Sequence, residues 1–287
     1  MKRHIVCVSV LMLAFSAILA LSCEKRALPE SDAAADNRQK LYTQIEAALC
    51  SGMTSLELPI DGNVCDVEGM LARIGRESVY ARTMLLKYAW NLKQRNGQTM
   101  LYLNFSYTQA WGNNIRRLKQ EAREIAARIV QNNIDTNYSD AEKALLLHDV
   151  LCNACRYDDA ASPQSRWGYG AFVRKCVVCE GYAEAYAMLL DAAGIPCRLV
   201  SGYALADMQP HLWNLVEFDG AWHHVDVTWD DADEITVYTY FLRDDSDFSR
   251  THRWDSSAYP AADESVSLTE IEADLQRNFV ARYFERT

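Results

Sequence analysis

The sequence has few of the residues that loosen or break a fold, with 12 Gly and 6 Pro among 287 residues. Because 49% of the residues are hydrophobic, this composition excludes disordered, collagenous and low-complexity proteins. Positive charge is also scarce, since 39 acidic residues outnumber 29 basic ones and the net charge is −10. Nucleic-acid binding needs clustered Lys and Arg to neutralise phosphates, so we expect no nucleic-acid partner.

One long apolar run does occur, at residues 5–21 behind a short basic start. It is short for a helix that spans a membrane. The residues that follow it, Ala20-Leu21-Ser22-Cys23, are similar to a bacterial lipoprotein signal in which Cys23 is acylated. We therefore predict a signal peptide at 1–22 and an exported lipoprotein that faces the periplasm or the cell exterior and is held to the membrane through Cys23. Plain secretory cleavage nearby and an uncleaved anchor are the alternatives.

Export would change the meaning of the nine cysteines. Seven lie beyond the signal and Cys23, and an odd number in an oxidising compartment leaves one thiol unpaired. We predict that Cys179 is that thiol. We expect disulfides among four of the others, namely Cys152, Cys155, Cys176 and Cys197.

The same cysteines also fit the spacing of a four-cysteine zinc site, Cys152-x-x-Cys155 followed by Cys176-x-x-Cys179. The first pair, however, ends a helical pattern and Cys179 begins another, so disulfides are the preferred interpretation. The acidic run 230–234 lacks the alternating oxygen ligands and Gly of a calcium loop. The sequence therefore predicts no metal and no cofactor.

The spacing of apolar residues divides the rest of the chain. We predict a tether at 23–37, a mostly helical N-terminal region at 38–140, a core domain at 141–260 and a C-terminal helix at 261–287. Ser139 and Glu142 form a capping box that opens a helix. In the N-terminal region we predict one strand at 100–107. We predict helices at 41–49, 67–74, 78–90 and 111–130.

Cys179 stands at the start of a predicted helix. Tyr182, Tyr186 and Leu189 follow at helical spacing, and Gly194 ends the pattern. Unpaired amide donors and the positive end of the helix macrodipole stabilise a thiolate at such a position. We expect this environment to lower the pKa of the thiol, although a buried small side chain at a helix start is the plainer alternative.

Two alternating segments, 211–218 and 221–228, are joined by Asp219-Gly220, which is typical of a two-residue hairpin turn. Such a turn pairs Phe218 with Ala221 and would pair His211 with Thr228. One face of the hairpin is nearly all apolar and is expected to form the core, and the opposite face carries His211 and Asp226.

These two side chains are predicted diagonal neighbours on one face of the hairpin. Asp226 can hold the Nδ1 proton of His211, which leaves the other ring nitrogen to accept the proton of Cys179. The alternative is a solvated polar face on which His211 and Asp226 have no chemical role.

An ordered set of sequence blocks resembles the transglutaminase-like superfamily of papain-like cysteine enzymes, over about residues 143–254. The blocks are Cys179-Glu-Gly-Tyr-Ala, Ala193-Gly-Ile-Pro-Cys-Arg, Val200-Ser-Gly-Tyr, His211-Leu-Trp-Asn and Trp222-His-His-Val-Asp-Val-Thr-Trp-Asp. The resemblance implies an α+β fold in which the helix that bears the catalytic Cys packs on an antiparallel sheet. It also implies Cys179 as nucleophile, His211 as base and Asp226 as orienting acid. Pro210 and Leu212 depart from the residues that often flank the histidine in this family, which leaves the shape of the substrate groove open.

The implied reaction passes through an oxyanion and a thioester on a peptide or side-chain amide. The backbone amide of Cys179 is one expected oxyanion donor, with Trp167 or Tyr169 as the second, and Trp213 is assigned to the substrate groove. The remaining histidines are expected to have structural or solvent roles, namely His148, His223, His224 and His252. We expect a hydrolase, with a glutamine transamidase and a non-catalytic envelope binding module as alternatives.

Overall fold

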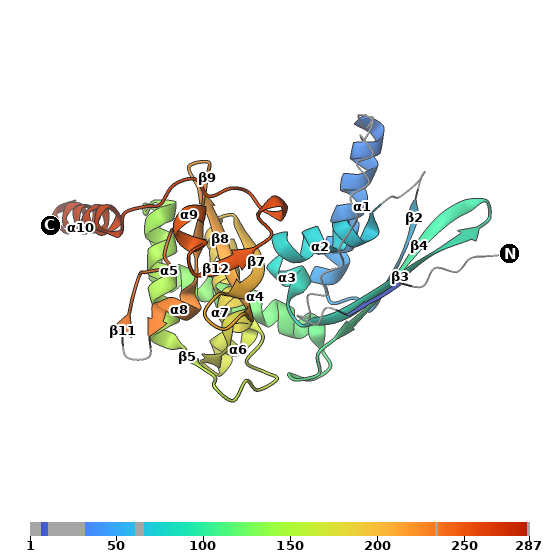
Figure 1. The fold of residues 1–287 in the computed structure, drawn as a ribbon, viewed down its shortest axis with the longest axis horizontal. Helices are drawn as coiled ribbons and strands as arrows, with labels where there is room; N and C mark the ends of the chain where they lie inside the picture. The colour runs from blue at the N-terminus through green and yellow to red at the C-terminus, as the bar shows by residue number, and fades with distance from the viewer. Residues whose placement is uncertain (1–6, 11–31, 61–65, 233–234, 286–287) are drawn as a thin grey trace. The chain divides into compact units, whose positions relative to one another are not determined.

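The computed structural model describes residues 7–10, 32–60, 66–232 and 235–285. The chain divides into two compact units, Met1–Arg116 and Arg117–Thr287 (Figure 1). Cys23 and most of the predicted signal peptide lie outside the described residues. None of the helices in the described part of the chain is both long and apolar enough to cross a membrane.

The first unit is a four-stranded sheet with helices on one face. The strand order is β1-β3-β4-β2, and all the neighbouring strands are antiparallel. The elements of this unit are β1 (Cys7–Val10), α1 (Asp32–Cys50), β2 (Ser55–Ile60), α2 (Val67–Glu77), α3 (Val79–Arg82), β3 (Leu85–Arg95) and β4 (Gln98–Tyr107).

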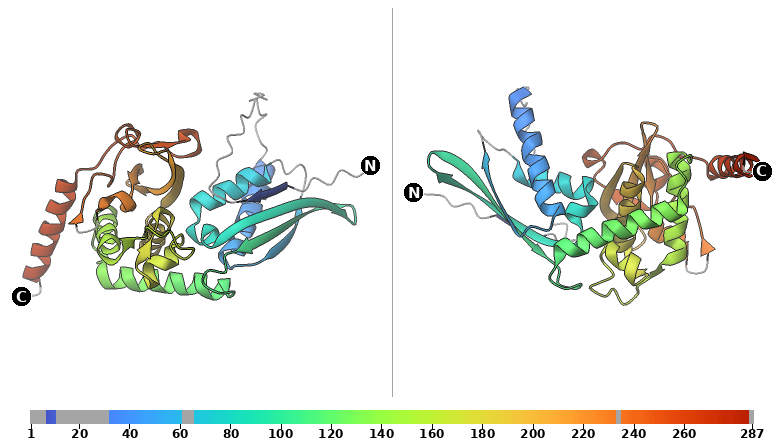
Figure 2. Two further views of the ribbon diagram at one scale, coloured as in Figure 1. Left: turned by 60° about the horizontal axis from the view of Figure 1, so that its bottom comes forward. Right: turned by 180° about the vertical axis from the view of Figure 1, so that it is seen from behind.

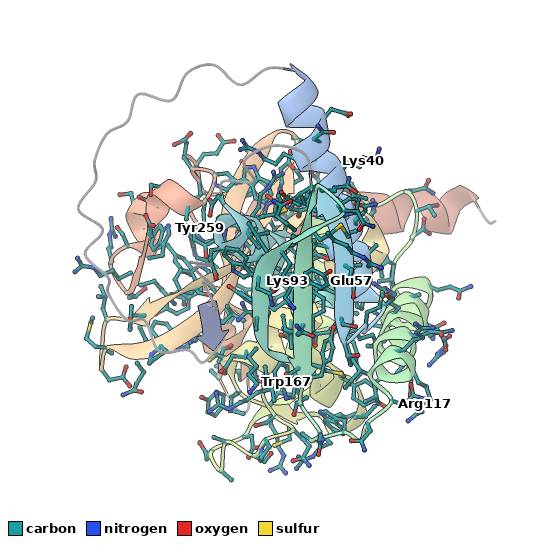
Figure 3. The ribbon with its side chains drawn as sticks, turned by 90° about the vertical axis from the view of Figure 1, so that its right-hand side faces the viewer. Lys40, Glu57, Lys93, Arg117, Trp167 and Tyr259 are labelled. Carbon is teal, nitrogen blue, oxygen red and sulfur yellow. The ribbon has the colours of Figure 1, made fainter. Side chains whose placement is uncertain are left out.

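The core of this unit lies between helices α1 and α2 and the sheet. Ile45, Ile74 and Leu101 are fully buried there. Burying an aliphatic side chain of this size stabilises a fold by about 1.5–3 kcal/mol. The opposite face of the sheet is polar, with Glu57 and Lys93 exposed (Figure 3). Alternation between the two faces thus explains why one side of the sheet carries the helices.

Two predictions for the N-terminal region need correction. Helix α1 begins at Asp32, inside the predicted tether 23–37. Residues 78–90, predicted as a helix, form α3 and the first part of strand β3. Strand β3 pairs with β4 across a tight turn in which Asn96 has φ 51° and Gly97 has φ 81°. Pairing with a partner strand overrides a helical pattern in the local sequence. The strand predicted at 100–107 lies within β4.

The second unit contains the segments that the sequence connects with chemistry. Its elements are α4 (Ile115–Asn133), α5 (Asp140–Ala154), β5 (Arg156–Tyr157), α6 (Gly168–Val173), β6 (Cys176–Val177), α7 (Cys179–Ala193), β7 (Cys197–Ala204), β8 (Gln209–Phe218), β9 (Ala221–Val225), α8 (Val227–Asp230), β10 (Asp231–Ala232), β11 (Ile235–Thr236), α9 (Asp245–Phe248), β12 (His252–Trp254), η1 (Ser256–Ala258) and α10 (Leu268–Glu285). Helix α4 starts two residues before the boundary between the two units, and most of it lies in the second unit. Helix α10 begins later than the predicted start at 261.

An antiparallel sheet of order β12-β7-β8-β9 forms the centre of this unit. Helix α7 packs against β7 and β8, and α5 packs against α7 (Figures 1 and 2). The α+β prediction, with the cysteine-bearing helix on an antiparallel sheet, is therefore confirmed. The capping box is also confirmed, because Ser139 and Glu142 exchange hydrogen bonds at the start of α5.

The β8–β9 hairpin has the predicted register, with Phe218 opposite Ala221 and Asn214 opposite Val225. Asp219 has φ 53° and Gly220 has φ 80°, as a two-residue turn of this kind requires. Strand β9 nevertheless ends at Val225, so the predicted pair of His211 with Thr228 does not form. Residues 211–216 of β8 are all buried, so neither face of this part of the strand is exposed to solvent.

Candidate active site

Cys179 is the first residue of α7, where the sequence placed it. Val178 precedes it in extended conformation, and its N–H donates to the Ser165 carbonyl at 3.0 Å. A Cβ atom at Gly181 would collide with that carbonyl oxygen and with the Val177 side chain, so only glycine fits there. The segment before α6 is thus held against the first turn of α7, beside Cys179.

Burial changes the acidity of Cys179, which is 8% exposed. It raises the pKa of the thiol, and the neighbouring Glu180 carboxylate, which accepts from Sγ at 3.3 Å, acts in the same direction. The interaction of the thiol with His211 lowers the pKa but does not offset burial. The expectation of a lowered pKa is therefore wrong for this structure, because desolvation of the thiolate outweighs the helix start.

His211 connects the thiol to Asp226. Its Nε2 lies 2.7 Å from Asp226 Oδ2, and the Cys179 thiol is near enough to its ring to raise the pKa of His211. The sequence analysis assigned Nδ1 to Asp226, and the structure corrects this assignment: Nε2 faces the carboxylate, so Nδ1 remains for the sulfur. The three predicted residues come together from a helix start, a strand and a helix cap.

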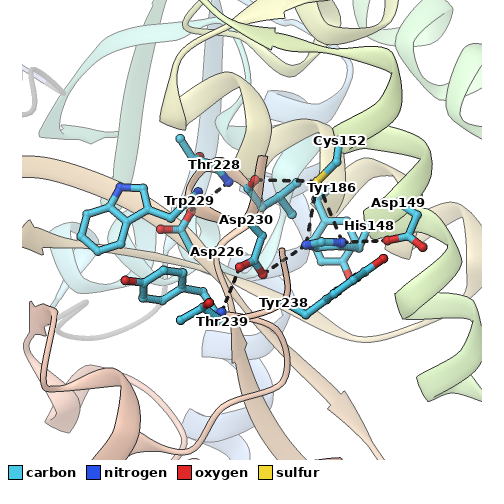
Figure 4. Close-up of polar contacts among 12 residues, drawn as sticks. His148, Asp149, Cys152, Tyr186, Asp226, Thr228, Trp229, Asp230, Tyr238 and Thr239 are labelled. Atoms are coloured by element: carbon cyan, nitrogen blue, oxygen red, sulfur yellow. Dashed lines mark hydrogen bonds and ion pairs between the residues drawn. The ribbon is translucent and has the colours of Figure 1, made fainter. Parts of the chain in front are cut away.

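The Asp226 carboxylate is almost fully buried and uses both oxygens. Oδ1 accepts from the backbone N–H groups of Thr228 at 3.0 Å and Trp229 at 3.4 Å, so Asp226 is the N-cap of α8 (Figure 4). Burial alone would raise its pKa, but His211 and His252 hold the pKa well below its usual range. The predicted strand through 226–228 gives way to α8 because this cap satisfies two backbone donors.

The charge on Asp226 decides the state of His211. Burial disfavours the imidazolium, yet attraction to the carboxylate outweighs it and raises the pKa of His211 to about 10. At neutral pH His211 is therefore mostly the imidazolium, and only the fraction that has released this proton can accept one from Cys179.

His252, which the sequence analysis assigned a structural or solvent role, also reaches Asp226. Its Nε2 lies 3.1 Å from the same Oδ2 that His211 contacts. Strand β12 is only three residues long and carries no motif, so no local signal pointed to it. Its pairing with β7, which aligns His252 with Ala204, places it there.

The three residues assigned to the oxyanion site or groove have different environments. The indole Nε1 of Trp167 (labelled in Figure 3) is buried without a hydrogen-bond partner, at the N-cap of α6. The Tyr169 hydroxyl donates to Glu121 on α4 at 2.9 Å, which engages it away from an oxyanion. Trp213 is fully buried and donates from Nε1 to His224 at 2.9 Å. Trp213 therefore packs behind His211 and does not line a groove.

A second buried polar cluster surrounds His148 (Figure 4). Its Nδ1 lies 3.2 Å from Asp149 and its Nε2 lies 3.3 Å from Asp230, the last residue of α8. Cys152 Sγ lies 3.9 Å from both ring nitrogens. Burial disfavours a charged ring, but the two carboxylates raise the pKa of His148 well above its ordinary value. One short helix thus connects this ion pair to Asp226.

The six cysteines whose side chains the structure describes are all thiols. The expected disulfides among Cys152, Cys155, Cys176 and Cys197 are not formed, because each sulfur faces a different partner. Three of them face backbone carbonyls of distant residues and Cys197 lies beside Asn214. Cys65 lies outside the described residues.

His211, Asp226 and His252 each offer a ligand atom, and these atoms lie within 4.8 Å of one another. Two histidines and a carboxylate can hold a transition metal. A metal would have to displace the proton from His211 Nε2, however, and with a pKa of about 10 that proton competes strongly at neutral pH. The observed hydrogen bonds account for all three groups without an ion.

Part of the chain is similar to known proteins. A sequence profile described as the transglutaminase-like superfamily matches residues 123–227. Kyphoscoliosis peptidase of Homo sapiens is 26% identical over 172 residues, which cover 51% of this chain and 26% of that protein. The chain thus spans about a quarter of the length of this relative. The protein of the same name from Mus musculus is 27% identical over 115 residues, covering 35% of this chain and 17% of that one.

A search of solved structures finds, among others, a TGase and calcium-bound LapG of Legionella pneumophila. The first has a TM-score of 0.36 and 14% identity, covering 61% of this chain and 50% of that one. The second has a TM-score of 0.31 and 14% identity, covering 59% of this chain and 93% of that one. Members of the superfamily are generally cysteine-dependent enzymes.

Proposed function

We propose that this chain, whose residues 123–227 match the profile of the transglutaminase-like superfamily, is a thiol hydrolase that cleaves peptide or side-chain amides through a thioester. Cys179 is the nucleophile and His211 is the general base. Asp226 orients the imidazole and stabilises its protonated form. The observation that carries the proposal is the buried His211, whose Nε2 lies 2.7 Å from Asp226 Oδ2 and whose pKa is raised both by Asp226 and by the Cys179 thiol.

The proposed reaction uses one proton that His211 takes and returns. The reaction begins from the form in which His211 is neutral: Cys179 transfers its proton to His211 Nδ1 as Sγ bonds to the amide carbon. The imidazolium then protonates the amine, the carbon–nitrogen bond breaks and a thioester remains. His211 next removes a proton from water, whose oxygen attacks the thioester, and the released sulfur regains its proton. Asp226 stays ionised and stabilises each imidazolium.

Two donors can stabilise the oxyanion. The backbone N–H of Cys179 stands at the first helical position, where amides have no partner within the helix. Trp167 Nε1 is a buried donor with no acceptor in the described residues, which supports it as the second. Loss of one oxyanion donor costs on the order of 10²–10³ in rate, so Trp167→Phe is expected to be impaired.

The N-terminal segment supports a further part of the proposal. The apolar run at 5–21 and the Ser22-Cys23 pair suggest that the enzyme acts outside the cytoplasm on a lipid anchor at Cys23. Its substrates would then be peptides or proteins of the cell envelope or beyond.

The function is tested by incubating the protein with a peptide library, with and without a primary amine, and reading the products by mass. We expect hydrolysed amides from wild type and none from Cys179→Ala. Cys176→Ala is the matched control, because Cys176 is also 8% exposed and has no role in the proposed chemistry. Its activity should stay within about twofold of wild type.

The same experiment distinguishes the alternatives. Products that incorporate the amine in preference to water would indicate a transamidase. Absence of any product, together with equal iodoacetamide labelling of Cys179 and Cys176, would contradict the enzymatic proposal and favour a binding module.

A further inference from the structure

The carboxylate of Asp226 supports two imidazoles through a single oxygen. Oδ2 lies 2.7 Å from His211 Nε2 and 3.1 Å from His252 Nε2, whereas Oδ1 accepts from the start of α8. All three side chains are at most 6% exposed, so water does not supply a substitute donor readily. The second imidazole is therefore part of what determines the direction of this carboxylate.

The ring of His252 is held by aromatic packing. It stacks on Phe248 with centroids 4.0 Å apart and an interplanar angle of 22°, and it lies 4.4 Å from the ring of Trp229. Close-packed neighbours leave such a ring little freedom to rotate away from Asp226.

The other nitrogen of His252 is also engaged. Nδ1 lies 2.9 Å from the Thr251 hydroxyl, whose proton can go to Nδ1 or, at 3.4 Å, to the Phe248 carbonyl. Because the ionised Asp226 carboxylate only accepts, the proton of a neutral His252 ring resides on Nε2, and donation from Thr251 to Nδ1 favours the same tautomer. Burial lowers the pKa of His252 and the charge of His211 acts in the same direction, so the ring is neutral when His211 is protonated.

We propose that His252 is a positioning residue for the thiol chemistry: its Nε2–H fixes Asp226 Oδ2 in line with His211 and thereby keeps the imidazole aimed at Cys179. This inference rests on the proposed function, because it concerns the reactivity of the same thiol. His252 does not contact the substrate; it acts through Asp226.

The test compares two substitutions of similar size. In His252→Gln the amide nitrogen takes the place of Nε2 and still donates, whereas His252→Leu fills the space without a donor. The readout is the second-order rate constant for alkylation of Cys179 by iodoacetamide, with kcat and KM for a cleaved peptide. We expect His252→Leu to lower the rate constant and kcat by about tenfold, with KM unchanged, and His252→Gln to stay within about threefold of wild type.

His224 provides the matched control. It is also fully buried and stacks on Phe248, at 4.4 Å and 13°, but its Nε2 pairs with Asp245 at 2.8 Å and not with Asp226. His224→Leu and His224→Gln should lower the melting temperature as the His252 variants do, while they differ little from each other in alkylation rate. Equal rates in His252→Leu and His252→Gln would overturn the proposal.

Thr251→Val keeps the imidazole in the core and so remains informative if His252→Leu does not fold. Without the hydroxyl, Nδ1 can take the proton that Nε2 would donate, and alkylation should slow by about threefold. An unchanged rate would contradict the positioning role. If wild-type Cys179 reacts no faster with iodoacetamide than Cys176, the proposed function fails. If Cys179 is reactive but its rate does not respond to substitutions at residues 251 and 252, only the positioning role of His252 fails.

Discussion

Asp226 and His211 hold opposite charges in a site from which water is nearly excluded. The pKa of His211 is about 10 in the folded protein and near 6.5 in an unfolded chain, so the folded state binds this proton more tightly. The pair therefore stabilises the fold fully below about pH 6.5, and this contribution is lost as the pH rises toward 10. The Asp226 carboxylate, whose pKa is lowered, remains ionised over that whole range.

Replacement of Asp226 by Asn tests this charge pairing. The variant keeps the shape of the side chain but removes the attraction that raises the pKa of His211, so that pKa should fall toward or below its ordinary value. Wild type should then lose about 2–5 kcal/mol more than Asp226→Asn in free energy of unfolding between pH 6.5 and 9.5, measured by urea titration. The variant should also cleave peptide at least about 10²-fold more slowly. Parallel pH dependence of the two proteins would contradict the ion pair.

Helix α8 is the element that connects the two buried polar clusters. Asp226 caps its start, and its last residue, Asp230, lies beside His148 and also accepts from the Tyr240 backbone at 3.0 Å. Asp230 is fully buried, and burial raises its pKa while His148 lowers it. The carboxylate therefore depends on His148 for compensation of its charge.

His148→Leu should leave Asp230 without that compensation. We expect a loss of about 3–5 kcal/mol in free energy of unfolding, and recovery of part of it in the double variant His148→Leu/Asp230→Asn. Urea denaturation of the four proteins in a double-mutant cycle measures the coupling. His223→Leu is the control, because His223 is equally buried but bonds only the Glu264 backbone carbonyl. A coupling near zero would mean that α8 is held by packing alone.

Sequence reasoning succeeded for elements whose signal is local. The Asp219-Gly220 turn determines the register of β8 and β9, and the pattern around Tyr182 predicts where α7 begins. It failed where distant segments decide the outcome. Strand β3 exists because β4 pairs with it, and His252 reaches Asp226 because β12 adds to the edge of β7. The three residues of β12 carry no motif from which its pairing with β7 could be predicted.

The direction of the pKa shift of Cys179 was predicted wrongly for a related reason. A helix start is visible in the sequence, but the depth at which the fold buries that start is not. Burial raises the pKa of the thiol here, so its reactivity depends on the basicity of His211 more than on the helix terminus.

At the scale of the whole molecule, every residue assigned to the chemistry lies in the unit Arg117–Thr287. Cys179, His211, Asp226 and His252 come from elements of one sheet and the helices packed on it. The family profile also falls inside this unit, at residues 123–227. The first unit has a core of its own between α1, α2 and its sheet. Alkylation of Cys179 should therefore need only the second unit.

A fragment of residues 113–287, which keeps all of α4, tests this division. We expect its Cys179 to react with iodoacetamide within about threefold of the full chain, because His211 and Asp226, which act on the thiol, are both in the fragment. Peptide turnover is measured in parallel. If the fragment keeps its alkylation rate but loses peptide turnover, substrate recognition belongs to the first unit. If alkylation is slower by more than about tenfold, the thiol site is incomplete without the first unit.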